Sequence, residues 1–414
     1  MRVTNRMLAN NFLTDMTTNL NNLQTLQQQL TSGKEIRRPS DDPLKVARAM
    51  QLHSEIGANK QYNENIKDTL SWLEQTDTAL GQLGDQTHRI RELLVSAGNV
   101  AYGTDERKKI NDEVKEIIGQ MSQTLNASFD GRFIFGGTRG TAKPVNVIKG
   151  PMVTKPQKTS KSPDGSGDAK VTVTEKFDPK ENTDYKIIIN DATKGTVTFE
   201  ENGKAISKNL NINTKELDLG NGIKFEINGD LKDGATYEFT ALTDGEKLVY
   251  ADRFGKEILD AEGIMGEKLV TEISQGVRIE YNTTAVDVIE FKDNKGKDRD
   301  LREILENIVA HLDSPDSDAD AVKKITNEDL AALDAVMDNI LKLRSQVGAK
   351  GNRMESALEK NKEENFNLTE ILSKTEDIDL TEKTMEYAVA ISVYMASLQT
   401  SARVLQPTLM DYVR

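Results

Sequence analysis

Both ends of this chain carry the same apolar spacing, and that spacing constrains the fold more than any other feature of the sequence. From Arg6 to about Leu30 the apolar residues follow one another at alternating intervals of four and three, and the segment that begins near Asp379 carries a comparable stripe. This spacing is typical of helices that pack along one seam. Each segment lies at a chain end without a core of its own, so we expect the two segments to pair.

The two seams define the assembly interface that we expect. In the N-terminal helix the interface residues are Leu13, Met16, Leu20, Leu23 and Leu30. In the C-terminal helix they are Ile391, Tyr394, Leu398 and Leu405. Asn, Gln and Thr fill much of the N-terminal segment, which therefore has few i,i+4 ion pairs and middling helix propensity. Such a helix needs a partner, which is either another subunit or the rest of an ordinary intramolecular bundle.

Longer helices are predicted inside these ends. Asp42 and Pro43 supply a helix N-cap and a first helical position, and the four-three spacing continues from there to Leu94. A second helix, which we expect to be capped by Thr104, ends at the glycine-rich stretch 129–140. Together these segments predict an antiparallel helical pair.

The segment between the helices has a different character. Four Asn-Gly or Asp-Gly dipeptides separate runs of β-branched and aromatic residues, which is typical of β-hairpins. The predicted strands cover 171–175, 185–190, 196–200, 222–227 and 235–242. A further hairpin is expected within 272–291, after which helical spacing returns at 301–312 and from Glu328 onward.

These elements predict an α+β fold. We expect an elongated rod of long antiparallel helices, with a terminal coiled-coil layer and a helical-bundle layer that includes a β-hairpin, and with an inserted all-β domain. The expected boundaries are 1–40 and 376–414 for the two parts of the terminal coiled coil, 41–141 and 269–375 for the two parts of the helical rod, and 142–268 for the β insert.

Charge and composition exclude several classes of partner. The formal net charge is −13 and no basic stripe offsets it, which argues against nucleic acid. The longest relevant uncharged run, 387–402, is too short and too polar to span a bilayer, so no membrane partner is expected. Residues 1–16 lack the apolar core and cleavage site of a secretory signal. The chain has no cysteine, so disulfides and thiolate metal sites are excluded.

Catalytic and cofactor sites find no support in the sequence. His53, His88 and His311 stand far apart, and no second ligand lies at metal-site spacing, so we expect neither a metal, a cofactor nor enzymatic activity. The acidic run 313–320 lacks the glycine and the final glutamate of a calcium loop, which indicates a solvated loop. Glycines at 136–140 do not follow a parallel strand, which favours a turn over a phosphate site.

Four motifs resemble the flagellin family in the family's order. In the N-terminal half they are LTSGKEIRRPSDDP and SFDGRFIFGG, and in the C-terminal half they are RSQVGAKGNRMESAL and EDIDLTEKTMEYAVAISVYMASLQTSARV. The resemblance covers roughly the first 140 and the last 150 residues and leaves out the β insert. The start MRVT, the segment RPSDDP and the ending DYVR are most similar to the family's hook-associated protein 3 type.

This resemblance implies a structural function in the bacterial flagellum. Members of this type are exported through the flagellar secretion channel and join the hook to the filament. The expected partners are further copies of the chain, another hook-associated protein on the hook side, flagellin on the filament side, and a cytoplasmic export chaperone at the C-terminal region. The family's terminal regions are disordered in the free subunit and become helical on assembly. The alternative is a minor flagellin, or a surface adhesin on a flagellin-like stem.

Overall fold

The computed structural model describes residues 5–36, 38–98, 103–158, 167–173, 177, 179, 182–211, 214–220, 222–258, 262–314 and 319–404. The chain divides into two compact units. The first contains Met1–Ile66, Ile273–Gly276 and Ser356–Arg414, and the second contains Lys67–Glu272 and Val277–Glu355. Long helices and antiparallel sheets make up the fold, so the predicted α+β class with an inserted β domain is confirmed.

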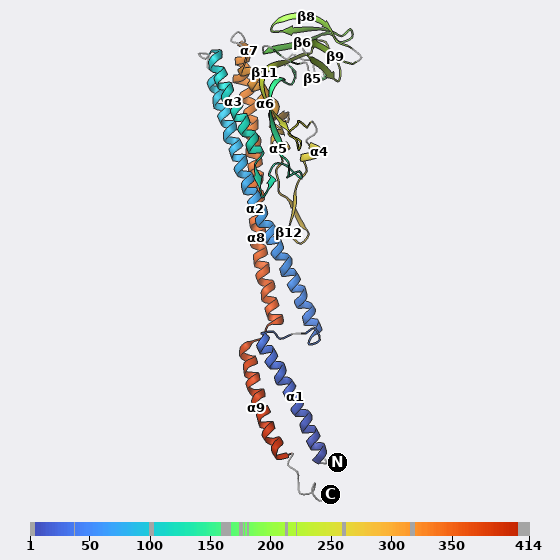
Figure 1. The fold of residues 1–414 in the computed structure, drawn as a ribbon, viewed down its shortest axis with the longest axis vertical. Coiled ribbons are helices and arrows are strands. Elements are labelled where there is room, and N and C mark those ends of the chain that lie inside the picture. Colours follow the sequence, from blue (N-terminus) through green and yellow to red (C-terminus); the bar gives the residue numbers. More distant parts are fainter. Residues whose placement is uncertain are drawn as a thin grey trace. The chain divides into compact units, whose positions relative to one another are not determined.

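In the first unit the two ends of the chain lie side by side. Helix α1 (Asn5–Ser32) and helix α9 (Leu380–Val404) run antiparallel, as Figure 1 shows. A capping residue marks the start of α9, and a glycine marks the end of α1. Asp379 Oδ1 accepts hydrogen bonds from the backbone N of Thr381 at 2.8 Å and of Glu382 at 3.2 Å, which caps α9. Gly33, with φ +69°, ends α1 in the left-handed conformation that glycine favours.

The first unit also contains the start of α2 (Pro43–Ala97) and the end of α8 (Leu330–Glu376). Asp42 Oδ1 accepts hydrogen bonds from the backbone N of Leu44 and Lys45, each at 3.1 Å, so the predicted N-cap is confirmed. A small core joins the two helices, with Ala49, Leu52, Ile56 and Leu372 buried and Leu368 packed against them.

Asparagines continue this core where apolar residues would be expected. Asn59 and Asn63 of α2 and Asn361 of α8 are buried, and Asn365 of α8 is half-buried. Asn361 Nδ2 donates a hydrogen bond to the carbonyl oxygen of Ile273 at 2.8 Å. The Oδ1 atoms of the other three have no hydrogen-bond partner among the described residues. This polar section is less favourable than an apolar seam, because buried acceptors without partners cost free energy.

In the second unit the predicted helical seam is well buried. The α2 residues at the four-three positions are each at most 2% exposed: Leu73, Thr76, Leu80, Leu83, Thr87, Ile90 and Leu94. The second unit also contains α3 (Thr104–Leu125), α6 (Leu301–Leu312), α7 (Ala319–Lys324), the π-helical turn η1 (Ile325–Asp329) and the start of α8. The expected cap of α3 is wrong by one residue, because Gly103 occupies the N-cap position and Thr104 is already helical.

Short elements connect the helices of the second unit to the sheets. Asp130 (φ 49°) and Gly131 (φ 73°) form the turn between β1 (Ser128–Phe129) and β2 (Arg132–Phe133), so part of the glycine-rich stretch is a tight hairpin after α3. The expected hairpin near 272–291 is present as β12 (Val270–Ser274) and β13 (Val277–Glu280). The sequence after it forms a short helix, α5 (Ala285–Ile289), which Thr284 caps. The remaining short elements are α4 (Glu262–Met265), β14 (Glu290–Lys292) and β15 (Asp298–Asp300).

The β insert consists of two antiparallel sheets. One has the order β3-β11-β6-β7-β8, with β4 also on β11, and the other has the order β5-β10-β9. Their bounds are β3 (Val145–Val153), β4 (Gln157–Lys158), β5 (Asp168–Val173), β6 (Thr183–Asp191), β7 (Thr196–Glu201), β8 (Lys204–Asn209), β9 (Glu216–Gly220), β10 (Ile223–Asn228) and β11 (Thr236–Tyr250). Four of the five strands predicted within the insert are confirmed, and the fifth is confirmed over 171–173, since 174–175 lie outside the described residues. Strands β3, β4, β8 and β9 were not predicted.

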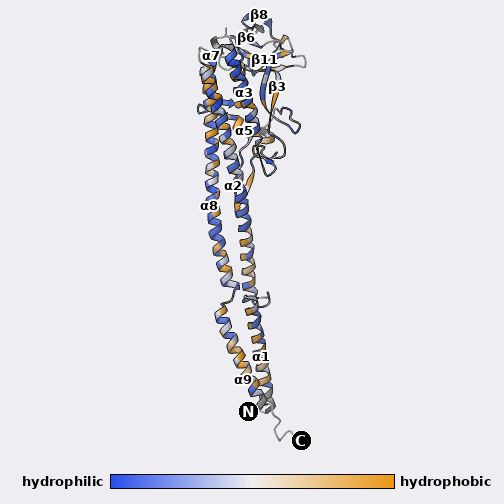
Figure 2. Ribbon diagram, turned by 60° about the vertical axis from the view of Figure 1, so that its left-hand side comes forward, coloured by the Kyte–Doolittle hydropathy of each residue, from blue (hydrophilic) through white to orange (hydrophobic). Residues whose placement is uncertain are grey.

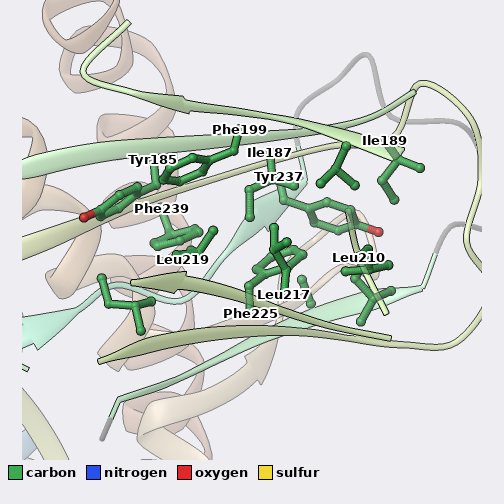
Figure 3. Close-up of a cluster of buried hydrophobic side chains, with 14 of the residues drawn as sticks. Tyr185, Ile187, Ile189, Phe199, Leu210, Leu217, Leu219, Phe225, Tyr237 and Phe239 are labelled. Atoms are coloured by element: carbon green, nitrogen blue, oxygen red, sulfur yellow. The ribbon is translucent and has the colours of Figure 1, made fainter. Parts of the chain in front are cut away.

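One apolar core fills the space between these sheets (Figure 3). Aromatic side chains dominate it. Tyr185 stacks on Phe199 and on Phe239, with ring centroids 5.5 and 5.1 Å apart, and Phe225 of the second sheet stacks on Phe239 at 6.1 Å. Such pairs add stability beyond the burial of their area. The insert therefore has its own hydrophobic core.

Candidate assembly surface

The contact between α1 and α9 follows one seam on each helix. Six α1 side chains are half-buried at alternating intervals of four and three: Phe12, Met16, Asn19, Leu23, Leu26 and Leu30. Six α9 side chains follow the same rule: Lys383, Tyr387, Ala390, Tyr394, Ser397 and Ser401. Among the side chains that the structure describes in α1 and α9, none is buried. The pair is therefore held by little apolar burial of its own.

The structure separates the predicted interface residues into two groups. Met16, Leu23, Leu30 and Tyr394 are half-buried in the seam between α1 and α9. Leu13 and Leu20 are 47% and 46% exposed on the flank of α1 beside the seam, and Ile391 and Leu398 are 36% and 39% exposed on α9. Leu405 lies outside the described residues. The predicted stripe thus combined two faces of α1, one already covered and one exposed.

The sequence prediction missed Phe12 and Leu26, which both belong to the covered face of α1. The signal was present, because Phe12, Met16, Asn19, Leu23, Leu26 and Leu30 keep the four-three rule without interruption. Asn19 is polar, so the series of apolar residues at this spacing is interrupted in the sequence and the face is harder to recognise. A polar residue at one such position is a recognised feature of helix pairs that must choose one register.

Helix α9 exposes a larger apolar surface than α1. Met385, Val389, Val393 and Met395 are 62%, 63%, 46% and 59% exposed, in addition to Ile391 and Leu398. Figure 2 shows apolar residues along this helix. These six residues lie on both flanks of α9, away from the seam. We call them together the outer face of α9: Met385, Val389, Ile391, Val393, Met395 and Leu398. So many large apolar side chains on one helix mark an interaction surface more often than a solvated one.

The connections at the inner ends of α1 and α9 are tied together by backbone and side-chain bonds. Glu35 N donates to the carbonyl oxygen of Glu376 at 2.7 Å, and Ile378 N donates to that of Gly33 at 3.1 Å. Lys34 Nζ lies 2.7 Å from Asp377 Oδ1. This hydrogen bond raises the pKa of Lys34 and lowers the pKa of Asp377, so both groups stay charged over a wider pH range.

The three histidines each lie beside a carboxylate. His53 is 3.1 Å from Glu376, His88 is 3.5 Å from Glu92, and His311 is 2.7 Å from Asp329. Within the described ranges, no three His, Asp or Glu residues cluster as metal ligands would. Most of the acidic run proposed as a solvated loop, 315–318, lies outside those ranges.

The glycines at 136–140 form a close backbone turn. Gly137 has φ +59°, and a Cβ added there would lie 2.2 Å from the carbonyl oxygen of Met265. This position therefore requires glycine for packing. Among the helices in the described part of the chain, none has the length and apolar content needed to cross a bilayer.

Comparison with known proteins finds a match in the N-terminal third of the chain. The family model for the bacterial flagellin N-terminal helical region matches residues 3–139, which include α1, α2 and α3. Over these residues the chain is similar to the flagellin family. The resemblance that the two N-terminal motifs indicated is thereby confirmed.

Individual relatives match over about a third of the chain. It is 28% identical to a flagellin from Clostridium tyrobutyricum over 128 residues, which are 31% of this chain and 34% of that protein. It is 25% identical to the flagellar hook-associated protein 3 of Salmonella typhimurium over 151 residues, which are 36% of this chain and 48% of that protein. The matches thus span about a third to a half of these flagellin-family relatives.

One solved structure, also of a flagellar hook-associated protein, aligns with more of the chain. The structure of a flagellar hook-associated protein from Vibrio parahaemolyticus, described as putative, aligns with 81% of this chain and 100% of its own, with 15% sequence identity and a TM-score of 0.47.

Proposed function

We propose that this protein is a structural subunit of the bacterial flagellum that joins the hook to the filament and polymerises through α1 and α9. The observation that carries the proposal is the outer face of α9, where six large apolar side chains are between 36% and 63% exposed. Because the α1–α9 pair buries none of its described side chains, association with neighbouring subunits supplies the burial that the pair lacks.

The junction is favoured over other positions in the flagellum by the relative from Salmonella typhimurium, whose name is flagellar hook-associated protein 3. The start MRVT, the segment RPSDDP and the ending DYVR support the same assignment. In this proposal the chain contacts its own copies, another hook-associated protein on the hook side and flagellin on the filament side. It is exported from the cell after a cytoplasmic chaperone has bound its C-terminal region, and it acts without a cofactor and not as an enzyme.

The proposal also assigns roles along the chain. Residues 1–40 and 376–414 form the polymerising layer, 41–141 and 269–375 form the helical layer that contacts lateral neighbours, and 142–268 form a β domain that faces solvent. The separate core of the insert supports this last role, because a domain with its own core needs no neighbour to fold.

A second candidate is a filament flagellin whose β insert is displayed along the filament, as a minor flagellin or an adhesin. The match to flagellins from Clostridium tyrobutyricum and from Bacillus subtilis, each 28% identical, favours it. The two candidates predict different positions for the same protein.

Immunogold labelling of flagella with antibodies against the β insert separates the candidates. The junction proposal predicts gold at one point between hook and filament, and predicts that deletion of 387–414 abolishes that label and motility while a soluble monomer remains. Gold along the whole filament would favour the second candidate. Restoration of motility by the truncated chain would contradict assembly through α9.

A further inference from the structure

A groove in the second unit lies between a strand and a helix. Its walls are Arg278, Ile279 and Glu280 of β13 and Ala349, Lys350 and Arg353 of α8, and its volume is about 480 Å³. Ile279 is buried, whereas Arg278 and Arg353 are exposed. The groove is open to solvent and large enough for several side chains.

None of the three cations of this groove forms an ion pair with a described residue, although the charges of Asp287 and Glu280 act on Lys350 from a greater distance. Among the residues that the structure describes, no carboxylate lies within ion-pair distance of Arg278, Lys350 or Arg353. Other cations of the same unit are paired, as Arg344 is with Asp77 at 2.9 Å and Lys268 is with Asp287. Three unpaired cations beside one carboxylate, Glu280, give the groove a net positive potential.

The titration of Lys350 agrees with that potential. Partial burial lowers the pKa of Lys350 and the positive charge of Lys268 lowers it further, and the charges of Asp287 and Glu280 offset this shift only in part. The charged form of Lys350 is therefore under-stabilised in the isolated chain, and an added anion would stabilise it.

The chain also carries carboxylates without partners. Glu359 and Glu363 are exposed on α8 in the first unit, and neither forms an ion pair with another described residue. Their spacing of four residues places both on one face of the helix. Because the whole chain has a net charge of −13, copies of it repel one another unless acidic and basic surfaces meet locally.

We infer that the groove of Arg278, Lys350 and Arg353 is a lateral contact site that binds the Glu359 and Glu363 carboxylates of a second copy of this chain. The inference rests on the proposed polymerisation and adds a partner surface to it. The groove and the acidic face are different surfaces, so each copy offers one of each. A contact of this kind is heterologous and builds a ring or a helical tier instead of a closed dimer.

Zero-length carbodiimide cross-linking of the assembled full-length protein tests the contact directly, since it joins only carboxylates and amines that touch. Assemblies of equal parts isotopically heavy and light chain should give a mixed-isotope peptide linking Lys350 to Glu359 or Glu363. Lys350 is the one amine among the three groove cations. Cross-links of Lys350 to other carboxylates only, or same-isotope links only, would overturn the inference.

Charge reversal in cells gives an independent test. A chain with Lys350→Glu and Arg353→Glu should form few junction foci, as should a chain with Glu359→Lys and Glu363→Lys. Co-expression of the two should restore foci, because each groove then meets a face of opposite charge. Lys342→Glu, an exposed change on α8 outside the groove, is the matched control and should assemble normally.

The outcomes separate this inference from the proposed function. If the unaltered chain forms no foci at the junction, the proposed function fails. If the unaltered chain forms foci and both reversed chains do so equally well alone, only the groove contact is overturned. Reversed chains that fail alone and are not restored together also overturn it, provided that each monomer unfolds at the temperature of the unaltered one.

Discussion

Phe12 and Leu13 are neighbours in α1, yet Phe12 is half-buried in the seam with α9 whereas Leu13 is 47% exposed. Phe12 therefore stabilises the helix pair in the free monomer, whereas Leu13 contributes only to assembly. We expect Phe12→Ala to lower the helix content of the free monomer, at a cost of about 1–2 kcal/mol to the pair. Leu13→Ala should leave that content unchanged and weaken assembly only. Circular dichroism of the two monomers checks the first effect, and equal loss of helix in both would contradict the division.

The terminal helices should be the least protected helices of the monomer. Their described side chains are at most half-buried, whereas the α2 seam between Leu73 and Leu94 is at most 2% exposed. Amide exchange of dilute monomer should therefore be fast across 16–30 and 391–404 and slow across 73–94, because local opening is easiest where few apolar contacts break. Assembly should slow exchange at both ends. Firm protection of the ends in the free monomer would refute this prediction.

Leu398→Asp should block assembly without unfolding the monomer. Leu398 is 39% exposed on the outer face of α9, so a charge there stays solvated in the free chain and should change its stability by no more than about 0.5 kcal/mol. In the assembly the same charge would be buried without a partner, which costs several kcal/mol. Gln399→Asp, on the next residue and also exposed, is the control. A melting temperature that falls as much as assembly does would count against this reasoning.

Substitution of leucine for two asparagines of the first unit should change the free energy of unfolding in opposite directions. Asn59→Leu removes a buried oxygen without a partner, so the free energy of unfolding should rise by about 1–2 kcal/mol. Asn361→Leu breaks the 2.8 Å hydrogen bond to Ile273 and leaves the carbonyl oxygen of Ile273 without this donor. The free energy of unfolding should therefore fall by about 1–3 kcal/mol. Urea unfolding of both variants measures the contrast. Destabilisation by Asn59→Leu as large as that by Asn361→Leu would disprove it.

Glu306 should make the second unit less stable as pH rises. It is 5% exposed on α6, and burial raises its pKa to about 7 despite Lys247 Nζ at 3.6 Å. Between its ordinary pKa of 4.5 and about 7, the folded chain keeps a proton that the unfolded chain has released, so stability falls with pH across this window.

The matching substitution is Glu306→Gln, which removes the ionisation. Its free energy of unfolding should exceed that of the unaltered chain by about 2–3 kcal/mol at pH 8 and should match it near pH 4.5. Thermal or urea unfolding at both pH values measures this difference. An identical pH profile in the two proteins would show that Glu306 is not the group responsible.

Helices α2 and α9 were predictable from the sequence because periodicity and an N-cap agree at each of them. Asp42 and Asp379 mark helix starts in the sequence, and both side chains cap the backbone in the structure. The missed strand β3 shows the opposite case, since Gly150 and Pro151 interrupt its pattern. Proline is tolerated there because β3 lies at the edge of its sheet. Strand β8 was missed because its residues are mostly exposed, so burial imposes little apolar pattern on it.

The candidate surface was predictable only in part. Spacing shows which residues lie on an apolar face, but an apolar helix with two such faces does not show which face its own chain covers. Leu13 and Leu23 fit one predicted stripe equally well, and only the position of α9 separates them. The groove of Arg278, Lys350 and Arg353 had no sequence signal, because it joins residues from distant parts of the chain.

Strand β3 begins at Val145 and β11 ends at Tyr250, and these two residues are partners in the ladder that joins the strands. The chain thus leaves for the insert and returns from it at adjacent points. The strands β3 and β11 pack on α3 and α6, whereas the strands beyond them enclose the separate core. A laboratory could therefore replace β5 to β10 by a foreign domain while β3 and β11 keep their contacts with the helices.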